Sequence, residues 1–542
     1  MPPAADRPAG GAPASAVEGP PARATRGRRQ LGTPSLILAI AACLLLGHLA
    51  IATFFPSVAI NAVGVVVVAS IIGYVLLVRG DVFAAVLIVL FCSHFGYANN
   101  QGGLFNLVAG LLFGIFLLAK PAIRETMRGG DGLINALLGV LFVSNTLGLL
   151  LRNPLSMDMI GLQFVAFVGF LATFHVTSQL RLNEARLRQF LIVASVMAVY
   201  NFAVSMNQHY AVLQIETPLL GLTRELFYAT TNAFGTFSSA SANGQYAMMM
   251  LALVLPLLAA STSREALKLS PFHFVPVAVA LGLTLILANM RAAALEAVLI
   301  VVIYTMMFTL LHRRSFRNAK YVNMASAAVV IVLATVGVWF NLDNIADDFR
   351  EVEVREASSI ESGQALNRLG PWRYGWERLE RESWWLGYGH GNDLSNHIAW
   401  GGRAMSTGGV AGGGHLHNLY LALPMMFGWF GALAYVLLWL VVVFRLLAAV
   451  NRHGFASIVG VTCLGFLVSI GFFLLDEIKS GNAVQTINYA MVCWIWLALG
   501  LAAQRSLRVV VAEGRVRQQA REGRRPAEAG SVARQEAEKP RS

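Results

Sequence analysis

The chain has 542 residues, of which 56% are hydrophobic and 13% are charged. Soluble proteins carry about 25% charged residues, so this composition excludes an ordinary soluble domain and indicates many membrane-spanning helices. The formal net charge of +12 raises the question of nucleic-acid binding. The distribution of Lys and Arg along the chain favours a membrane explanation, so we expect membrane lipids rather than nucleic acid as partners.

Taken in order, the chain opens with a tail over 1–33 that is rich in Ala, Pro, Gly and Arg and lacks periodicity, which predicts a disordered cytoplasmic segment. Fourteen apolar runs follow, each predicting a helix. They span 34–54, 57–78, 82–98, 103–119, 132–151, 158–178, 188–209, 243–261, 272–289, 292–311, 321–340, 416–445, 455–475 and 484–504. The expected fold class is an all-α polytopic integral membrane protein with about 12–14 transmembrane helices.

The chain divides into five parts on this pattern. After the tail, we expect N-terminal transmembrane helices over 34–210, a central region over 211–445, C-terminal transmembrane helices over 446–504 and a charged cytoplasmic tail over 505–542. If the chain alternates from a cytoplasmic N-terminus, 30 of the 41 Lys and Arg residues fall on the cytoplasmic side. This positive-inside pattern predicts that the longest loop, 341–414, is periplasmic.

The stretch from Arg368 to Gly431 departs from the apolar pattern because it is rich in His, Trp, Arg and Gly. Residues 370–383 predict an interfacial helix, since Leu369, Trp372, Trp376 and Leu379 form one apolar stripe. The G-Y-G-H-G run at 387–391 follows no strand, so it predicts a close backbone turn rather than a dinucleotide site. The helix that begins near residue 416 carries small residues on one face, and Pro424 is a candidate kink.

Several charged or titratable residues in this part of the chain could carry chemistry. Arg291 stands between two apolar runs at the predicted outer boundary, where it either snorkels to the interface or binds an anion such as a diphosphate. Arg368 is a second candidate cation at that boundary. His415 and His417 could be structural, could bind a metal, or could act as a base near neutral pH. No carboxylate lies at ligand spacing from either histidine, so we expect no metal and no cofactor.

These motifs together resemble the O-antigen ligase and polymerase superfamily of bacterial membrane glycosyltransferases. N-M-R-A-A-A-L is similar to the family segment that carries an arginine, with Arg291 at the matching position. R-L-G-P-W followed by W-W-L-G-Y-G-H-G looks like the family's arginine helix and glycine turn, with Arg368 matching. H-N-L-Y-L-A-L-P-M-M-F-G-W-F-G resembles the helix of the third motif, with His417 and Asn418 matching. T-N-A-F-G-T-F-S-S-A-S-A-N-G-Q-Y-A is a looser likeness, so the resemblance covers roughly 230–435.

The resemblance makes 211–445 the catalytic region. It implies transfer of a glycan from a polyprenyl-diphosphate carrier to the lipid A core or a growing polysaccharide, at the periplasmic face of the bacterial inner membrane. It also implies an inverting, metal-independent reaction in which Arg291 and Arg368 stabilise the diphosphate and His417 is the base. Because we find no Asp/Glu pair to share that work, the arginines would carry it. The residues expected to contact substrate are Arg224, Arg373, His415, Asn418, Tyr420 and Trp372.

Three other functions stay open on these motifs. A repeat-unit polymerase and a protein O-glycosylating enzyme belong to the same superfamily and differ only in their acceptor. A transporter of lipid-linked glycans is a non-enzymatic alternative, but it should place its main charges near the bilayer midplane. The candidate charges here cluster at the outer boundary, which favours the enzyme.

Overall fold

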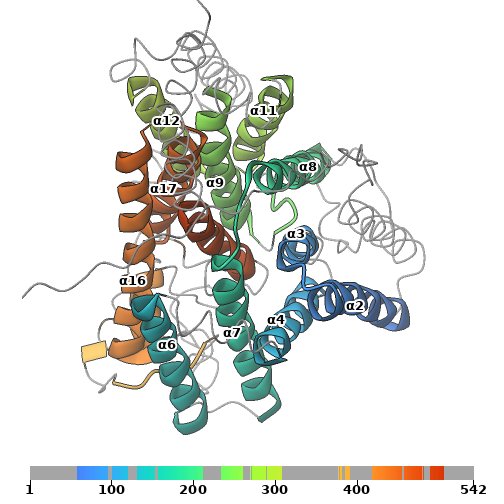
Figure 1. The fold of residues 1–542 in the computed structure, drawn as a ribbon, viewed down its shortest axis with the longest axis vertical. Helices are drawn as coiled ribbons and strands as arrows, with labels where there is room; N and C mark the ends of the chain where they lie inside the picture. The colour runs from blue at the N-terminus through green and yellow to red at the C-terminus, as the bar shows by residue number, and fades with distance from the viewer. Residues whose placement is uncertain are drawn as a thin grey trace, which may run out of the picture.

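The computed structural model describes the parts of the chain that form most of the apolar helices. These are residues 58–94, 101–119, 131–152, 157–210, 233–237, 239–259, 269, 271–288, 290–307, 376, 379–380, 385–390, 418–454, 457–478, 480 and 489–505. Helices joined by turns account for these residues, and no strand occurs among them. Figure 1 shows the arrangement.

The helices have the following bounds. They are α2 (Val58–Gly73), the π-helical turn η1 (Tyr74–Val78), α3 (Val82–Ser93), α4 (Gln101–Ala119), α6 (Gly132–Leu151), α7 (Met157–Ser178), α8 (Glu184–Tyr210), α9 (Ala240–Ala259), α11 (Pro271–Leu287), α12 (Arg291–Met306), α16 (Leu419–His453) and α17 (Ile458–Asp476). Residues 489–505 form a further helix. Five of the described helices are long and apolar enough to cross a membrane. The expected all-α polytopic membrane fold is therefore confirmed.

Each predicted apolar run that falls among the described residues has a helix at its position. The agreement is closest for 132–151, which is α6 (Gly132–Leu151). The runs at 34–54 and 321–340 lie outside the described residues, as does most of the predicted periplasmic loop. Of the predicted interfacial helix, only residues 376, 379 and 380 are described, and they are helical. Trp376 is 54% exposed and Leu379 is 8% exposed, so one apolar residue of the stripe faces outward and the other packs inward.

Helix α9 is the centre of the described bundle. Its residues from Met248 to Leu258 are almost all buried, as expected for a helix that is apolar on every face. It packs against α17, α11 and α12, while α16 packs against α17 and α6, and α4 against α7 (Figure 1). Close crossings depend on glycine: a Cβ atom on Gly110 would lie 2.6 Å from the Gly169 Cα atom, so α4 and α7 touch backbone to backbone.

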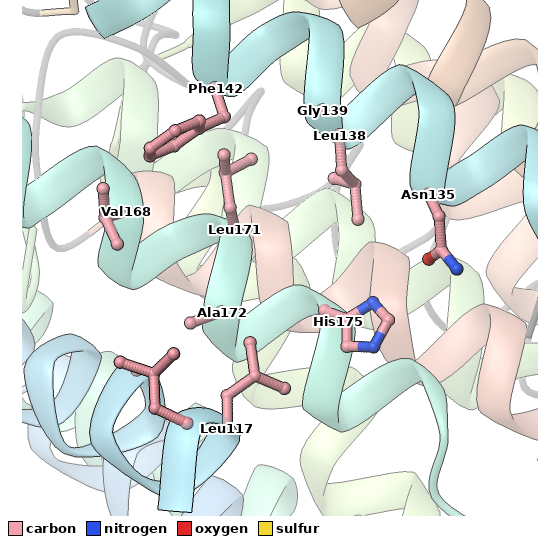
Figure 2. Close-up of a pocket in the computed structure, with 11 residues that line it drawn as sticks. Leu117, Asn135, Leu138, Gly139, Phe142, Val168, Leu171, Ala172 and His175 are labelled. Carbon is pink, nitrogen blue, oxygen red and sulfur yellow. The ribbon is translucent and has the colours of Figure 1, made fainter. Parts of the chain in front are cut away.

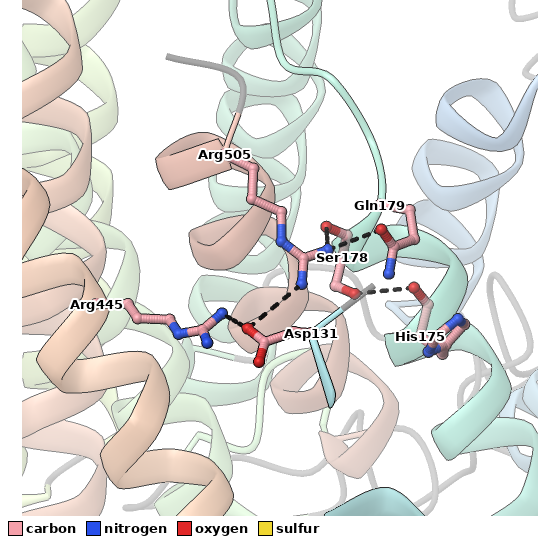
Figure 3. Close-up of polar contacts among 6 residues, drawn as sticks. All are labelled: Asp131, His175, Ser178, Gln179, Arg445 and Arg505. Carbon is pink, nitrogen blue, oxygen red and sulfur yellow. Dashed lines mark hydrogen bonds and ion pairs between the residues drawn. The ribbon is translucent and has the colours of Figure 1, made fainter. Parts of the chain in front are cut away.

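Polar contacts gather at one end of the bundle and join three segments that are far apart in sequence. Arg445 of α16 forms an ion pair with Asp131, the residue before α6, and Arg505 Nη2 lies 4.0 Å from the same carboxylate oxygen. We call Asp131, Arg445 and Arg505 the arginine cluster (Figure 3). All three residues fall in segments that the basic-residue count predicts to be cytoplasmic. Their meeting agrees with that topology, and the side of the membrane stays a prediction.

Candidate active site

The structure describes three of the residues predicted to act on substrate, and all three lie at helix starts. Arg291 is the first residue of α12, Asn418 caps α16, and Tyr420 is the second residue of α16. For Arg291 the structure gives the backbone position alone. The other predicted residues lie outside the described part of the chain, so their roles stay predictions. They are His417, His415, Arg368, Arg224, Arg373 and Trp372.

Asn418 fixes the start of α16 through its side chain. Its backbone is extended, and its Oδ1 atom accepts a hydrogen bond from the Leu421 amide at 3.1 Å. Asparagine is among the best helix caps because it satisfies an amide that the first turn leaves without a partner. Asn418 is 8% exposed, so this cap is largely shielded from solvent. The cap sets the direction in which the chain leaves the helix, and in sequence the next residue outward is His417.

The start of α16 is also tied to the end of α17. The Leu419 amide donates to the Glu477 carbonyl at 3.0 Å, and the Tyr420 hydroxyl donates to the Leu474 carbonyl at 2.8 Å. The Leu419 contact gives a partner to another amide in the first turn of α16, and the Tyr420 contact gives one to a carbonyl near the end of α17. Tyr420 was predicted to contact substrate, and its hydroxyl proton serves this helix contact. Two helix ends are thereby held together next to His417 in sequence.

A buried group of polar side chains lies at this junction, and the sequence analysis missed it. The Gln245 amide donates to Glu477 Oε1 at 3.0 Å and to Ser480 Oγ at 2.8 Å, and it also donates to the Asp476 carboxylate. Asp476 is 1% exposed and Glu477 is fully buried. We call Gln245, Asp476, Glu477 and Ser480 the acidic cluster. The sequence analysis found no Asp/Glu pair that would share the work of the arginines at the diphosphate, and the structure does not test this buried pair in that role.

A signal for this pair was present in the sequence. Residues 476 and 477 end an apolar helix as D-E, and the C-terminal end of a helix carries a partial negative charge that disfavours acids. Two acids at that position need a specific donor. Gln245 supplies it from α9, more than two hundred residues earlier in the chain. Spacing along the sequence could not reveal this long-range contact.

The first turns of α9 connect the acidic cluster to the start of α12. Gly244 faces α12 so closely that a Cβ atom there would lie 3.1 Å from Met290 Cβ and 3.2 Å from Ala293 Cβ. Arg291 lies between these two residues in the chain. Gln245, the next residue of α9, reaches the acidic cluster instead. Consecutive residues of α9 therefore hold the starts of α12 and α16 and the end of α17 at one place.

The segment 233–237 before α9 is held by side-chain amides of α8. Asn201 Oδ1 accepts from the Thr236 amide at 2.8 Å, and Gln208 both donates to the Gly235 carbonyl at 2.8 Å and accepts from its amide at 2.7 Å. Asn243 of α9 joins this network by accepting from Asn201 at 2.7 Å. Gly235 has a φ of +58°, and a Cβ there would collide with Asn201 and Asn243. The network fixes the direction in which the chain enters α9.

Helix α16 breaks at Gly428, where φ is +68° and ψ is 175°. Pro424, which the sequence suggested as the kink, lies inside the first helical stretch, so the position of the break was predicted wrongly. The break leaves the Met425 and Met426 carbonyls without helical partners, and the turn 385–390 supplies them. The Tyr388 amide donates to the Met425 carbonyl and the Gly389 amide to the Met426 carbonyl, each at 2.7 Å.

The expected close turn at G-Y-G-H-G is confirmed over its described residues, and its contact with α16 needs one glycine from each segment. A Cβ on Gly387 would lie 2.2 Å from the Met426 carbonyl, and a Cβ on Gly428 would lie 2.2 Å from the Trp385 carbonyl oxygen. Arg152 donates to the Leu386 carbonyl and lies 4.7 Å over the Tyr388 ring. The turn 385–390 and helix α16 therefore approach each other closely only because each has a glycine at the contact.

His390 ends this turn in a dry environment. Its amide donates to Asn145 Oδ1 of α6 at 2.7 Å, and its ring packs against Phe167, Phe170 and Phe427. Burial lowers the pKa of the His390 imidazole to about 4, so the ring is neutral at pH 7. This histidine serves as a packing residue of the turn.

A family model for O-antigen ligase matches residues 276–436. We call this stretch the O-antigen ligase domain, after the family that it resembles. The resemblance to the O-antigen ligase and polymerase superfamily is therefore confirmed over these residues, and the apolar helices make the chain a multi-pass membrane protein. A search of curated proteins found no match to the chain.

The O-antigen ligase domain covers most of α11, all of α12, the turn 385–390 and the first half of α16 up to the residues after Gly428. Two residues that contact it lie outside the matched residues: the Ala233 amide donates to the Leu287 carbonyl at 2.8 Å, and the Glu477 carbonyl accepts from the Leu419 amide at 3.0 Å. Gln245 supports the second contact through its hydrogen bond to the Glu477 carboxylate. The structure thus brings residues from both flanks of the domain to the starts of α12 and α16.

Metal binding has no built site among the residues that the structure describes, because no group of three or more His, Cys, Asp or Glu side chains gathers there. The acidic cluster contains two acids, and both accept from Gln245. His415 and His417 lie outside the described residues, so the prediction that they bind no metal rests on the sequence alone.

Proposed function

We propose that the protein is a membrane glycosyltransferase that moves a glycan from a polyprenyl-diphosphate carrier to an acceptor hydroxyl at the periplasmic face, as an O-antigen ligase does. The match of residues 276–436 to that family carries the proposal. The meeting of the α12 and α16 starts supports it, since each begins at or beside a residue proposed to act. The positive-inside count favours the periplasmic side for that end of the bundle.

In the proposed reaction, the acceptor oxygen attacks the anomeric carbon, and the bond from that carbon to the diphosphate oxygen breaks. The electron pair leaves with the diphosphate, and the hydroxyl proton passes to His417. Arg291 and Arg368 stabilise the charge that develops on the diphosphate, because guanidinium groups bind phosphate oxygens through two hydrogen bonds and stay charged. A single displacement of this kind inverts the anomeric centre and routes no step through a metal.

The described residues have a positioning role in this mechanism. The Asn418 cap and the Leu419 contact to Glu477 hold the helix start that follows His417. Gln245 fixes the acidic cluster on which that contact depends. A base that is misplaced by about 1 Å can cost on the order of 10²-fold in rate, so these supports matter to transfer. Arg224, Arg373, Trp372 and His415 complete the proposed substrate contacts.

A deletion strain tests the proposal. We expect its lipopolysaccharide, separated on a gel, to lack the polymeric glycan, while extracted carrier-linked glycan accumulates in polymerised form. Lipopolysaccharide that carries a single repeat unit would identify a polymerase instead. Carrier-linked glycan that is protected from periplasmic enzymes would identify a transporter. Transfer by the purified protein from a lipid-linked glycan to lipid A core then establishes the acceptor.

A further inference from the structure

A cleft of about 520 Å³ lies between α4, α6 and α7 (Figure 2). Its lining includes Asn135, in the first turn of α6, and Asp131 of the arginine cluster directly precedes that helix. The walls of the cleft are apolar side chains such as Leu117, Leu138 and Leu171. Along α6 the lining runs from Asn135 to Phe142, which at 1.5 Å per residue is about 10 Å. That depth fits within one leaflet, whose hydrocarbon is about 15 Å thick. The rim is exposed, with Leu118 at 71% and Phe142 at 40%.

One end of the cleft is polar, and it holds a group that lacks a partner. His175 lines the cleft and is 3% exposed, and its Nε2 atom is buried without a hydrogen-bond partner. Asn135 lies at the same end (Figure 2). Buried polar atoms in proteins are nearly always paired, and one that borders an apolar cleft favours a ligand with hydrogen-bonding oxygens.

The arginine cluster lies directly beyond this polar end. The Ser178 hydroxyl donates to the His175 carbonyl at 2.9 Å, and the Ser178 carbonyl accepts from Arg505 Nη1 at 3.0 Å (Figure 3). Arg445 and Arg505 both approach the carboxylate of Asp131, so two guanidinium groups lie side by side at this end of the cleft. Their side chains are 27% and 23% exposed, which leaves them within reach of a headgroup.

We propose that this cleft binds an anionic glycerophospholipid of the membrane. One acyl chain lies between α4, α6 and α7, the ester oxygens lie at His175 and Asn135, and the phosphate lies at Arg445 and Arg505. The order along the site, from apolar walls to polar groups to positive charge, is the order of groups in such a lipid. The site is separate from the proposed active site, because Asn418 and Arg445 lie toward opposite ends of α16.

Glycine positions in the cleft allow a direct test. Gly139 lines the cleft, and a Cβ atom there would meet nothing within 4 Å, so Gly139→Leu fills the space without disturbing helix contacts. Gly161 of α7 is equally open but is not part of the cleft lining, which makes Gly161→Leu the matched control. The full chain is purified and reconstituted in phosphatidylcholine nanodiscs, and binding of fluorescent phosphatidylglycerol and phosphatidylcholine with identical chains is measured.

We expect the wild type and Gly161→Leu to prefer phosphatidylglycerol, and Gly139→Leu to bind it about tenfold more weakly. Replacing Arg445 and Arg505 by Gln should remove the preference for phosphatidylglycerol, with the affinity for that lipid falling about fivefold for each charge removed. His175→Ala should weaken binding of both lipids about equally, because it contacts the ester region. Lipid binding is read directly, so failure of the proposed transferase function leaves this result intact.

Four results would overturn the lipid site. The first is equal binding by Gly139→Leu and Gly161→Leu, and the second is equal affinity for the two lipids. The third is displacement of phosphatidylglycerol by polyprenyl phosphate at equal concentration, which would make the carrier lipid the occupant. The last is a photocrosslink from position 139 to residues 34–54 or to a second copy of the chain, which would mean that protein covers the cleft.

Discussion

The side-chain amide of Gln245 lies 3.0 Å from the Glu477 carboxylate and donates a hydrogen bond to it. This contact joins the start of α9 to the end of α17, and Glu477 in turn holds the start of α16 through its carbonyl. A single amide therefore supports the junction at which the proposed active site is built.

Replacing Gln245 by Ala should destabilise the protein. Two buried carboxylates would lose their common donor, and losing a hydrogen bond to a charged group costs about 1.5–3 kcal/mol. Transfer should fall together with the melting temperature in detergent. Gln189→Ala, which changes a half-buried glutamine of α8, is the control and should change neither. Unchanged melting and unchanged transfer in Gln245→Ala would show that the cluster does not support the site.

Replacing Gly387 by Ala should separate the turn 385–390 from α16. The new Cβ would overlap the Met426 carbonyl, and overpacking of this kind costs about 1–3 kcal/mol or more. We expect a lower melting temperature and faster proteolysis near the turn. Gly471→Ala in α17, where a Cβ meets nothing within 4 Å, should be neutral or stabilising. The idea fails if both variants melt alike.

Asn418 can be tested as a cap and as a substrate contact separately. Asn418→Ala should lose the hydrogen bond to the Leu421 amide and about 0.5–2 kcal/mol of stability, and transfer should fall. Asn418→Asp keeps a good cap, so stability should return. If transfer also returns, Asn418 acts by orienting the chain at His417. If Asp restores stability and leaves transfer low, the Asn418 amide nitrogen contacts substrate.

Arg291 and His417 should be needed for transfer itself. Arg291→Ala removes a charge-assisted contact to phosphate and should slow transfer about 10- to 100-fold, with partial rescue by Lys. His417→Ala should slow it about 10²- to 10⁴-fold while donor binding persists. Arg188→Ala and His273→Ala, which change exposed residues of α8 and α11, are the controls. Near-normal transfer in both test variants would mean that Arg291 is an interfacial residue and His417 a structural one.

Chelation tests the metal prediction. We expect transfer by the purified protein to survive EDTA, because the arginines are proposed to carry the charge of the diphosphate. The rate before and after chelator, and after addition of each divalent ion, is the measurement. Loss of activity that one ion restores would make His415 and His417 candidate metal ligands.

The sequence was sufficient for the helices and insufficient for their junctions. Apolar runs set the bounds of α6 and α11 to within a few residues, because burial in a bilayer needs about 20 apolar residues regardless of partner. The close turn was also predictable from the glycines of the run 387–391. The acidic cluster was not, because Gln245 and Glu477 meet only after α9 and α17 pack. The break in α16 was predicted at Pro424 because proline is the stronger local signal. Its position at Gly428 is set by the contact with the turn 385–390, which the sequence does not show.

The contacts across the borders of the ligase domain limit how it can be exchanged between proteins. Two residues outside 276–436 contact it directly: the Ala233 amide donates to the Leu287 carbonyl, and the Glu477 carbonyl accepts from the Leu419 amide. A chimera that transplants the matched residues alone would remove Leu287 and Leu419 from these two backbone partners. A graft that includes 233–245 and 476–480 keeps both contacts intact. The smallest exchangeable unit of this protein is therefore discontinuous in sequence.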